Sequence, residues 1–265
     1  MFYKPKDILP GKTLEELYKI RYKDPLKVPV RIKLKGNRVF ITAFVIFSDE
    51  LLKPYMNRDG YEENGTGTFA DHVIKGIKRF WGKEYIIPGI DGPVTVSVDI
   101  RTDIPKGQRA VLIRKARFSN TSYVSSPIPR MGWGVFMTLC PESAMINWSL
   151  YSPGRINLNL WNTVRMYEGV AAHEFGHTLG IGDAYGAHYR FFYEAPGTEG
   201  FLMNDNGSVS PEELLMVLRA HETGKMQYFP YRFVPGIWFP ELKKRIKRSL
   251  RRRKRRKKNR RFKSV

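Results

Sequence analysis

The most informative stretch of the chain spans residues 173–185 and reads HEFGHTLGIGDAY. Residues four apart on a helix lie on one face, so His173 and His177 can direct both imidazoles at one metal ion. Glu174 is turned away from that axis, where its carboxylate can reach a water molecule without binding the metal. Two imidazoles and an open coordination position suit Zn²⁺, so the motif predicts one catalytic zinc ion.

Two further residues extend the motif. Gly180 stands three residues after His177, where the helix has to end and turn sharply, and glycine permits such a turn. Asp183 follows six residues after His177 and is placed to supply a third ligand. The alternative third ligand is His188, which comes five residues later in the chain than Asp183.

The pattern H-E-x-x-H-x-x-G-x-x-D over residues 173–183 resembles that of the metzincin metalloproteases, and its aspartate is similar to that of the snapalysin-type branch. The resemblance implies a zinc-dependent metalloendopeptidase that hydrolyses peptide bonds of a protein or peptide substrate. A zinc-bound water would be the nucleophile, and Glu174 would be the general base and acid. The implied fold is an α+β zincin domain with a twisted mixed β-sheet, a backing helix, a zinc-binding active-site helix, a Met-turn and a C-terminal helix.

The same resemblance implies a methionine in a tight turn beneath the metal. Met203 lies twenty residues after Asp183 and is assigned to this Met-turn. Several metzincins carry, two residues after the methionine, a tyrosine that supports the transition state, but here that position is Asp205. Tyr185 is the remaining candidate for this support. The family also implies an edge strand before the zinc helix, expected at 155–161, against which an extended substrate pairs antiparallel.

Apolar periodicity predicts the other elements. Alternation of apolar and polar residues indicates strands at 28–35, 38–47, 94–100, 110–118 and 155–161. Helical spacing and capping residues indicate helices at 69–81, at about 163–179 and at 210–224. The stretch 119–145 is rich in Ser, Pro and Gly and is expected to be irregular. We therefore divide the chain into an N-terminal arm (1–26) with one short helix near 13–20, a catalytic domain (27–240) and a polybasic tail (241–265).

The tail carries most of the net charge of +21. Residues 243–263 hold 16 Lys and Arg and no acid, so the rest of the chain carries only about +5. Leu242, Ile246 and Leu250 recur every four residues and predict a short basic amphipathic helix over 241–250. A run of cations binds polyanions by releasing counterions, so nucleic acid, an anionic membrane or an acidic protein is the expected partner. The alternative is a plain solubilising tail without a partner. The alternative function is therefore a metzincin-like scaffold that acts mainly as a binding protein for nucleic acid or anionic membrane.

Four residues resemble site residues but are interpreted otherwise. His72 is expected to be a residue on a helix face and not a ligand. His221 and Glu222 would begin a second H-E-x-x-H motif, but Lys225 stands where its second histidine is needed, so they are assigned to a helix surface. Cys140 is the single cysteine, which excludes an intrachain disulfide, and it is expected to be a buried thiol.

The N-terminus offers no continuous apolar segment after its first charges, so no signal peptide is predicted. The longest apolar run, 43–47, is too short to cross a bilayer, so no transmembrane segment is predicted. These features indicate a cytoplasmic protein or one exported by a route that the sequence does not reveal.

Overall fold

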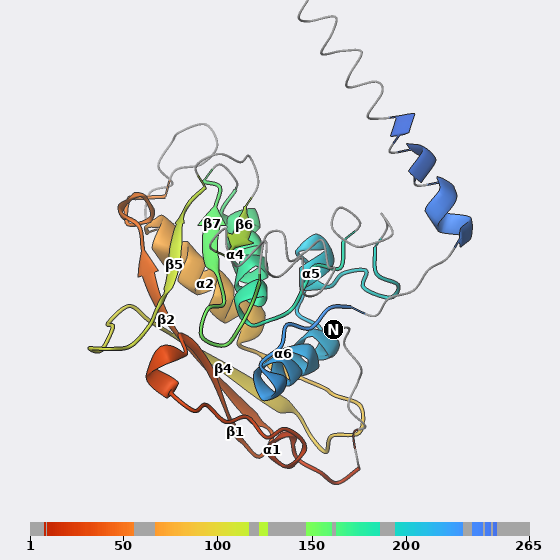
Figure 1. Cartoon of the computed structure of the whole chain (residues 1–265), viewed down its shortest axis with the longest axis horizontal. Helices are drawn as coiled ribbons and strands as arrows, with labels where there is room; N and C mark the ends of the chain where they lie inside the picture. The colour runs from red at the N-terminus through yellow and green to blue at the C-terminus, as the bar shows by residue number, and fades with distance from the viewer. Residues whose placement is uncertain are drawn as a thin grey trace, which may run out of the picture.

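The computed structural model describes residues 8, 10–55, 67–116, 122–126, 147–160, 163–185, 194–229, 235–240, 242–244 and 246–247. They form an α+β fold in which a mixed seven-stranded sheet packs against helices (Figure 1). The strands are β1 (Val30–Lys35), β2 (Arg38–Phe47), β3 (Glu84–Tyr85), β4 (Val94–Arg101), β5 (Val111–Lys115), β6 (Tyr123–Ser125) and β7 (Arg155–Leu158). The helices are α1 (Leu14–Leu17), α2 (Phe69–Trp81), α4 (Val164–Thr178), α5 (Leu202–Asp205) and α6 (Pro211–Thr223), with 3₁₀ turns η1 (Pro25–Lys27) and η2 (Asp49–Leu51).

The sheet has the strand order β3-β4-β2-β5-β7-β6, and β1 pairs with β2. Strands β4, β2, β5 and β7 are parallel to their neighbours in this series, whereas β1, β3 and β6 are antiparallel to theirs. The expectation that the strand before the zinc helix is an edge strand is wrong. β7 pairs with β5 on one side and with β6 on the other, so β6 takes the edge position.

Helices α2 and α4 pack against each other, α2 also contacts β4, and α4 also contacts β7 (Figure 1). The two helices approach closely because Gly76 of α2 lacks a side chain, and a Cβ there would collide with the carbonyl oxygen of Glu168. The indole Nε1 of Trp81 donates to the carbonyl of Ala172 at 3.0 Å. These contacts fix the helix that carries the H-E-x-x-H motif against the core.

Several predicted elements are confirmed with their boundaries. β2 and α2 span the residues that periodicity indicated, and α6 begins with a capping box in which Ser210 and Glu213 bond reciprocally. Gly224 ends α6 with a positive φ of 67°. The short elements β3, β6 and α5 were not predicted, and β6 lies in the stretch expected to be irregular.

The N-terminal segment contributes to the same core as the sheet. α1 begins at a capping box between Thr13 and Glu16, and its residues Leu14 and Leu17 are buried with the core cluster. Towards the C-terminus, residues 235–240, 242–244 and 246–247 are helical, and Leu250 with the cationic run after it lies outside the described residues. None of the helices in the described ranges is long and apolar enough to cross a membrane.

Candidate metal centre

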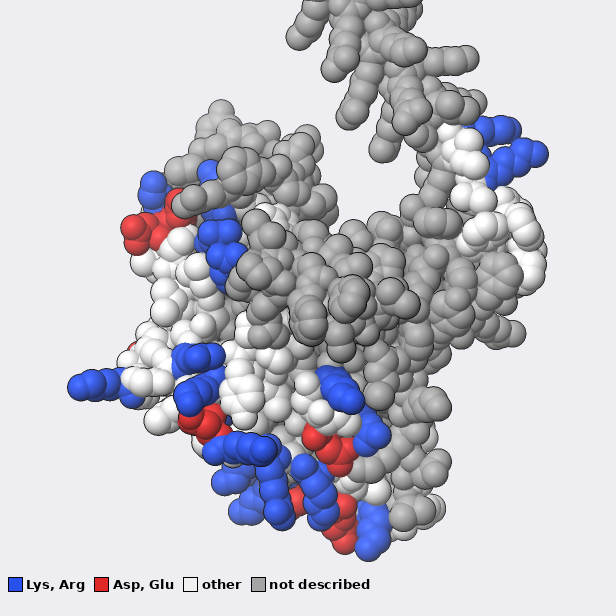
Figure 2. All heavy atoms as spheres, in the orientation of Figure 1, with Lys and Arg blue, Asp and Glu red and all other residues white. Residues whose placement is uncertain are grey.

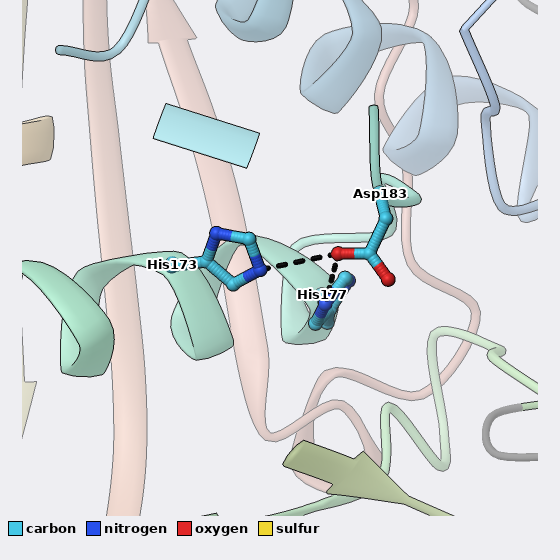
Figure 3. Close-up of side chains that lie close together, drawn as sticks. All are labelled: His173, His177 and Asp183. Atoms are coloured by element: carbon cyan, nitrogen blue, oxygen red, sulfur yellow. Dashed lines mark hydrogen bonds and ion pairs between the residues drawn. The ribbon is translucent and has the colours of Figure 1, made fainter. Parts of the chain in front are cut away.

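His173, His177 and Asp183 converge at one point, and one ligand atom from each lies within 4.8 Å of the other two. Oδ1 of Asp183 is 3.1 Å from Nε2 of His173 and 3.2 Å from Nε2 of His177 (Figure 3). Both histidines come from successive turns of α4, and Asp183 comes from the loop that follows the helix. The three residues could hold a metal ion.

The backbone fixes the orientation of both imidazoles. Nδ1 of His173 donates to the carbonyl of Leu202 at 2.8 Å, and Nδ1 of His177 donates to the carbonyl of Ile181 at 2.9 Å. A carbonyl oxygen only accepts, so the proton of each neutral ring stands on Nδ1 and the lone pair stands on Nε2. Metal-binding histidines are usually held by such a hydrogen bond. Each Nε2 atom is therefore oriented towards the cluster, and in the neutral ring it carries the lone pair that a metal ligand requires.

The lone pairs and the negative charge of the cluster favour a cation at its centre. Two Nε2 lone pairs and a carboxylate oxygen are all acceptors, so only a proton or a metal ion can join them. Burial lowers the pKa of His177, but the charges of Asp183 and Glu174 outweigh burial and raise it to about 9. Burial raises the pKa of Asp183, but the two histidines outweigh it and hold that pKa well below its usual range. The two-nitrogen, one-oxygen donor set fits a catalytic zinc site with an open position.

Gly180 makes the turn that brings Asp183 back to the helix. Its φ is +96°, a conformation that favours glycine, and a Cβ there would lie 2.8 Å from atoms of both Ala220 and Trp148. The loop beyond is held by backbone hydrogen bonds, in which Gln227 bonds with Gly180 and Gly182 at 2.8 and 2.9 Å. The position of Asp183 is therefore set by packing on both sides of the turn.

Met203 is fully buried directly beneath the motif helix. A Cβ at Gly176 would lie 2.5 Å from Sδ of Met203, so the glycine between the two histidines is the surface on which the methionine packs. Met203 belongs to α5, a single helical turn that ends at Asn206 in the left-handed conformation with φ 58°. The preceding residue, Leu202, supplies the carbonyl that orients His173.

Glu174 is 5% exposed on the same turn of α4 as His173. Its Oε2 is buried and has no hydrogen-bond partner among the described residues. Burial raises the pKa of Glu174, while the two histidines lower it and Asp183 raises it further. A buried carboxylate beside the ligands, with one oxygen that no described residue hydrogen-bonds, is suited to exchanging protons with a bound molecule.

Tyr185 lies next to the cluster, with its ring centroid 5.9 Å from that of His173. Burial raises the pKa of Tyr185, and the charges of Asp183 and Glu174 with a hydrogen bond to Asp183 raise it further, so the hydroxyl keeps its proton. Asp205 lies elsewhere and accepts hydrogen bonds from the N–H groups of Gly200 and Gly207. Of the two positions considered for transition-state support, the one beside the ligands is Tyr185.

Sequence reasoning missed the part that Glu213 plays at this site. In the sequence Ser210-Pro211-Glu212-Glu213 it is recognisable only as the third residue of a capping box, yet it is fully buried and its carboxylate also accepts the N–H of Met203 at 2.7 Å. The capping-box pattern predicts a bond to Ser210, at 2.7 Å here, but contains no signal for the second bond.

The other histidines serve different purposes. His72 lies on α2 as predicted but is only 3% exposed, and its Nδ1 is 3.2 Å from Oε1 of the buried Glu168. The assignment of His221 to a helix surface is wrong, because it is 2% exposed and bonds through Nδ1 to the hydroxyl of Tyr22 at 2.9 Å. Apolar neighbours on α6 do not reveal that a polar residue among them faces inward. His188 and Cys140 lie outside the described residues.

Comparisons with protein-family models, with curated proteins and with solved structures found no match. Function is therefore inferred from the fold and the site of this chain. What these establish is an α+β protein with a His-His-Asp group that could hold a metal ion.

Proposed function

We propose that the chain is a zinc metalloendopeptidase of the metzincin type, with His173, His177 and Asp183 as ligands and Glu174 as general base and acid. The observation that carries the proposal is the convergence of two backbone-oriented Nε2 atoms on Asp183, beside a buried carboxylate that has no described structural partner. A closed structural zinc site needs four protein ligands, whereas the described residues bring together three. Three protein ligands would leave one coordination position of the zinc open for water or substrate, as a catalytic site requires.

Zinc held by these ligands would act as a Lewis acid and bring the pKa of water to about 7. Glu174 would accept a proton from the water molecule whose oxygen attacks the peptide carbonyl carbon. When the carbon–nitrogen bond breaks, Glu174 would return that proton to the leaving amine nitrogen. Tyr185, which stays protonated, would donate its hydroxyl hydrogen to the oxygen that gains negative charge. Met203 would support the ligand helix from below.

A peptide substrate would bind in extended form along β6. This strand occupies the edge of the sheet, contacts α4, and has no strand on its other side among the described residues. The buried Asn157 side chain fastens β6 by donating to the carbonyl of Tyr123 at 3.1 Å and to Oγ of Ser125 at 3.2 Å. Strand addition supplies main-chain hydrogen bonds to any sequence, which suits an endopeptidase.

The resemblance to metzincins is supported by the order of elements, because the strands of the mixed sheet and the backing helix α2 all precede the motif helix α4, which is followed by the turn with Met203 and the last helix α6. The alternative, a scaffold whose main task is polyanion binding, is supported by the 16 cations of residues 243–263. One comparison of variants distinguishes the two functions. Replacing Glu174 should abolish proteolysis and leave polyanion binding intact, whereas replacing the tail cations should do the reverse.

The test compares the wild type with Glu174→Gln, which keeps the side-chain volume but removes the base. Elemental analysis should find about one zinc per chain in both proteins after reconstitution, because Glu174 is not a ligand. Cleavage of an unstructured protein such as casein should fall by roughly 10² to 10⁴-fold in the variant. Absence of bound zinc in the wild type would refute the ligand assignment, and equal cleavage by both proteins would refute the role of Glu174.

A further inference from the structure

One face of β1 and β2 lies outside the hydrophobic core. Along β2, Val39 and Ile41 are fully buried, whereas Phe40 between them is 37% exposed. The residues of β1 that alternate with its buried positions are Arg31, Lys33 and Lys35. The antiparallel register sets Lys33 opposite Phe40, with Arg31 opposite Thr42 and Lys35 opposite Arg38. The outward face of this strand pair is thus a track of cations beside an exposed aromatic ring.

The chain segment that precedes β1 lines an open groove of about 570 Å³ together with β1 and β2. The groove lies apart from the metal centre and shares no residue with it. It is lined by residues of β1, β2 and α1 and of the segment after α1: Glu15, Tyr18, Lys19, Ile20, Arg21, Tyr22, Pro25, Arg31, Ile32, Lys33, Leu34, Phe40 and Thr42.

Four cations and one carboxylate line the groove. Lys19, Arg21, Arg31 and Lys33 form no ion pair with an acidic residue among the described parts of the chain. The carboxylate, Glu15, already accepts the N–H of Gly36 at 2.7 Å. Figure 2 shows Lys and Arg gathered over β1 and α1 at the lower end of the face drawn, with fewer acidic side chains among them. The uncompensated charge favours a polyanionic occupant.

The exposed ring of Phe40 indicates which class of polyanion fits the groove. Phe40 lies opposite Lys33 on the outward face of the strand pair, where a planar group can stack on its exposed ring. Arg31 is itself held on this face, since its guanidinium lies over the ring of Phe44 at 4.8 Å. An acidic peptide has carboxylates for the cations but no planar group repeating beside each charge. A nucleic-acid strand has both a phosphate and a base in every unit, and its bases are available for stacking when it is single-stranded.

We propose that this groove binds single-stranded nucleic acid, with phosphates on Lys19, Arg21, Arg31 and Lys33 and a base stacked on Phe40. The site belongs to the folded body and is independent of the polybasic tail. It is also independent of the metal centre, so cleavage of a short peptide should be unaffected by changes in the groove. Binding in the groove would be an activity separate from the proposed peptidase activity.

The experiment uses the full-length chain in which all 16 Lys and Arg of residues 243–263 are replaced by glutamine, so that the groove dominates binding. Fluorescence anisotropy with a labelled oligothymidylate is measured over a range of salt concentrations. Lys33→Gln should weaken binding and reduce the slope of log K against log salt by about 0.7. Phe40→Ala should weaken binding about tenfold and leave that slope unchanged. The matched controls are Lys106→Gln and Ile86→Ala, two exposed residues outside the groove.

Binding by Lys33→Gln and Phe40→Ala equal to that of the parent would overturn the proposal. If Phe40→Ala fails to fold, Lys33→Gln is a surface change that still tests whether the cations bind phosphates. Phe40→Leu then tests whether the aromatic ring stacks on a base. Polyglutamate that binds as tightly as the oligonucleotide would assign the groove to an acidic protein instead. A duplex that binds as tightly, without dependence on Phe40, would reduce the groove to a general polyanion surface and would also overturn the proposal.

Discussion

Glu213 and Met203 are joined by a hydrogen bond in which the N–H of Met203 donates to Oε1 of Glu213 at 2.7 Å. The other carboxylate oxygen accepts the N–H of Ser210, also at 2.7 Å. The residue before Met203 is Leu202, whose carbonyl accepts the Nδ1 proton of His173 at 2.8 Å. A carboxylate on α6 therefore fixes the turn that orients a candidate metal ligand on α4.

Replacement of Glu213 by glutamine should loosen this turn, because the amide nitrogen of glutamine would face an N–H donor and could not accept its hydrogen. We expect the free energy of unfolding to fall by about 1 to 3 kcal/mol. The zinc affinity should fall by roughly 10-fold, as it does when other residues that orient a metal ligand are replaced. Urea denaturation and competition with a chromogenic chelator measure the two quantities. Glu212→Gln is the control, and equal zinc affinity in both variants would contradict the positioning role.

Gly176→Ala should destabilise the protein, because its Cβ would lie 2.5 Å from Sδ of Met203 and 3.2 Å from Trp81. Overpacking of this kind costs about 1 to 3 kcal/mol. The double variant with Met203→Ala removes the atom that would clash, so alanine at 176 should cost less in that background. A double-mutant cycle from urea denaturation measures the difference.

The control for this prediction lies on the same helix. At Gly169 the nearest atom to an added Cβ is 3.6 Å away, which is an ordinary contact distance. Gly169→Ala should therefore be neutral or stabilise the helix by up to about 1 kcal/mol. Equal destabilisation by the two alanines would show that the cost comes from α4 itself and not from Met203.

Regular elements with strong local signals could be predicted from the sequence. α2 combines a capping box at Thr68 with apolar residues at helical spacing, and β2 has a continuous β-branched and aromatic pattern. The pairing of β6 with β7 could not be predicted. β6 has three residues, too few for a period, and its place depends on contacts with Asn157 from a distant part of the chain.

The metal cluster could be predicted because spacing along one helix and one turn determines it. His173 and His177 share a helix face, and Asp183 follows a glycine turn, so the three converge within 4.8 Å. The residues that hold the cluster in place come from elsewhere in the sequence. Glu213 lies on α6, and only tertiary packing brings its carboxylate to the N–H of Met203, so no local pattern indicates its role.

Asp183→Ala should abolish tight zinc binding, because it removes one of three ligand atoms and leaves the two histidines without a counter-charge. His188→Ala should leave zinc affinity unchanged if Asp183 is the third ligand. Isothermal titration of the zinc-free protein measures both affinities. Strong loss in the His188 variant with retention in the Asp183 variant would reverse the assignment of the third ligand.

His221 is buried under the end of α4, with its ring 5.8 Å from Trp148. Burial lowers its pKa to about 3, whereas an unfolded chain gives histidine a pKa of about 6.5. The folded state therefore keeps His221 neutral at pH values where the unfolded state binds a proton. The stabilising contribution is fully present above about pH 6.5 and is lost as the pH falls towards about 3, by roughly 1.4 kcal/mol per pH unit.

His221→Gln removes this titration while keeping a polar side chain opposite the hydroxyl of Tyr22. The free energy of unfolding of the wild type should therefore fall more steeply than that of the variant below about pH 6.5, by roughly 1.4 kcal/mol for each pH unit. Urea denaturation of both proteins at several pH values in the presence of a chelator gives the difference. Titration of His173, His177 and Asp183 contributes equally to the unfolding free energies of both proteins, so it does not affect their difference. A difference that stays constant from neutral pH down to about pH 4 would show that His221 titrates alike in the folded and unfolded states.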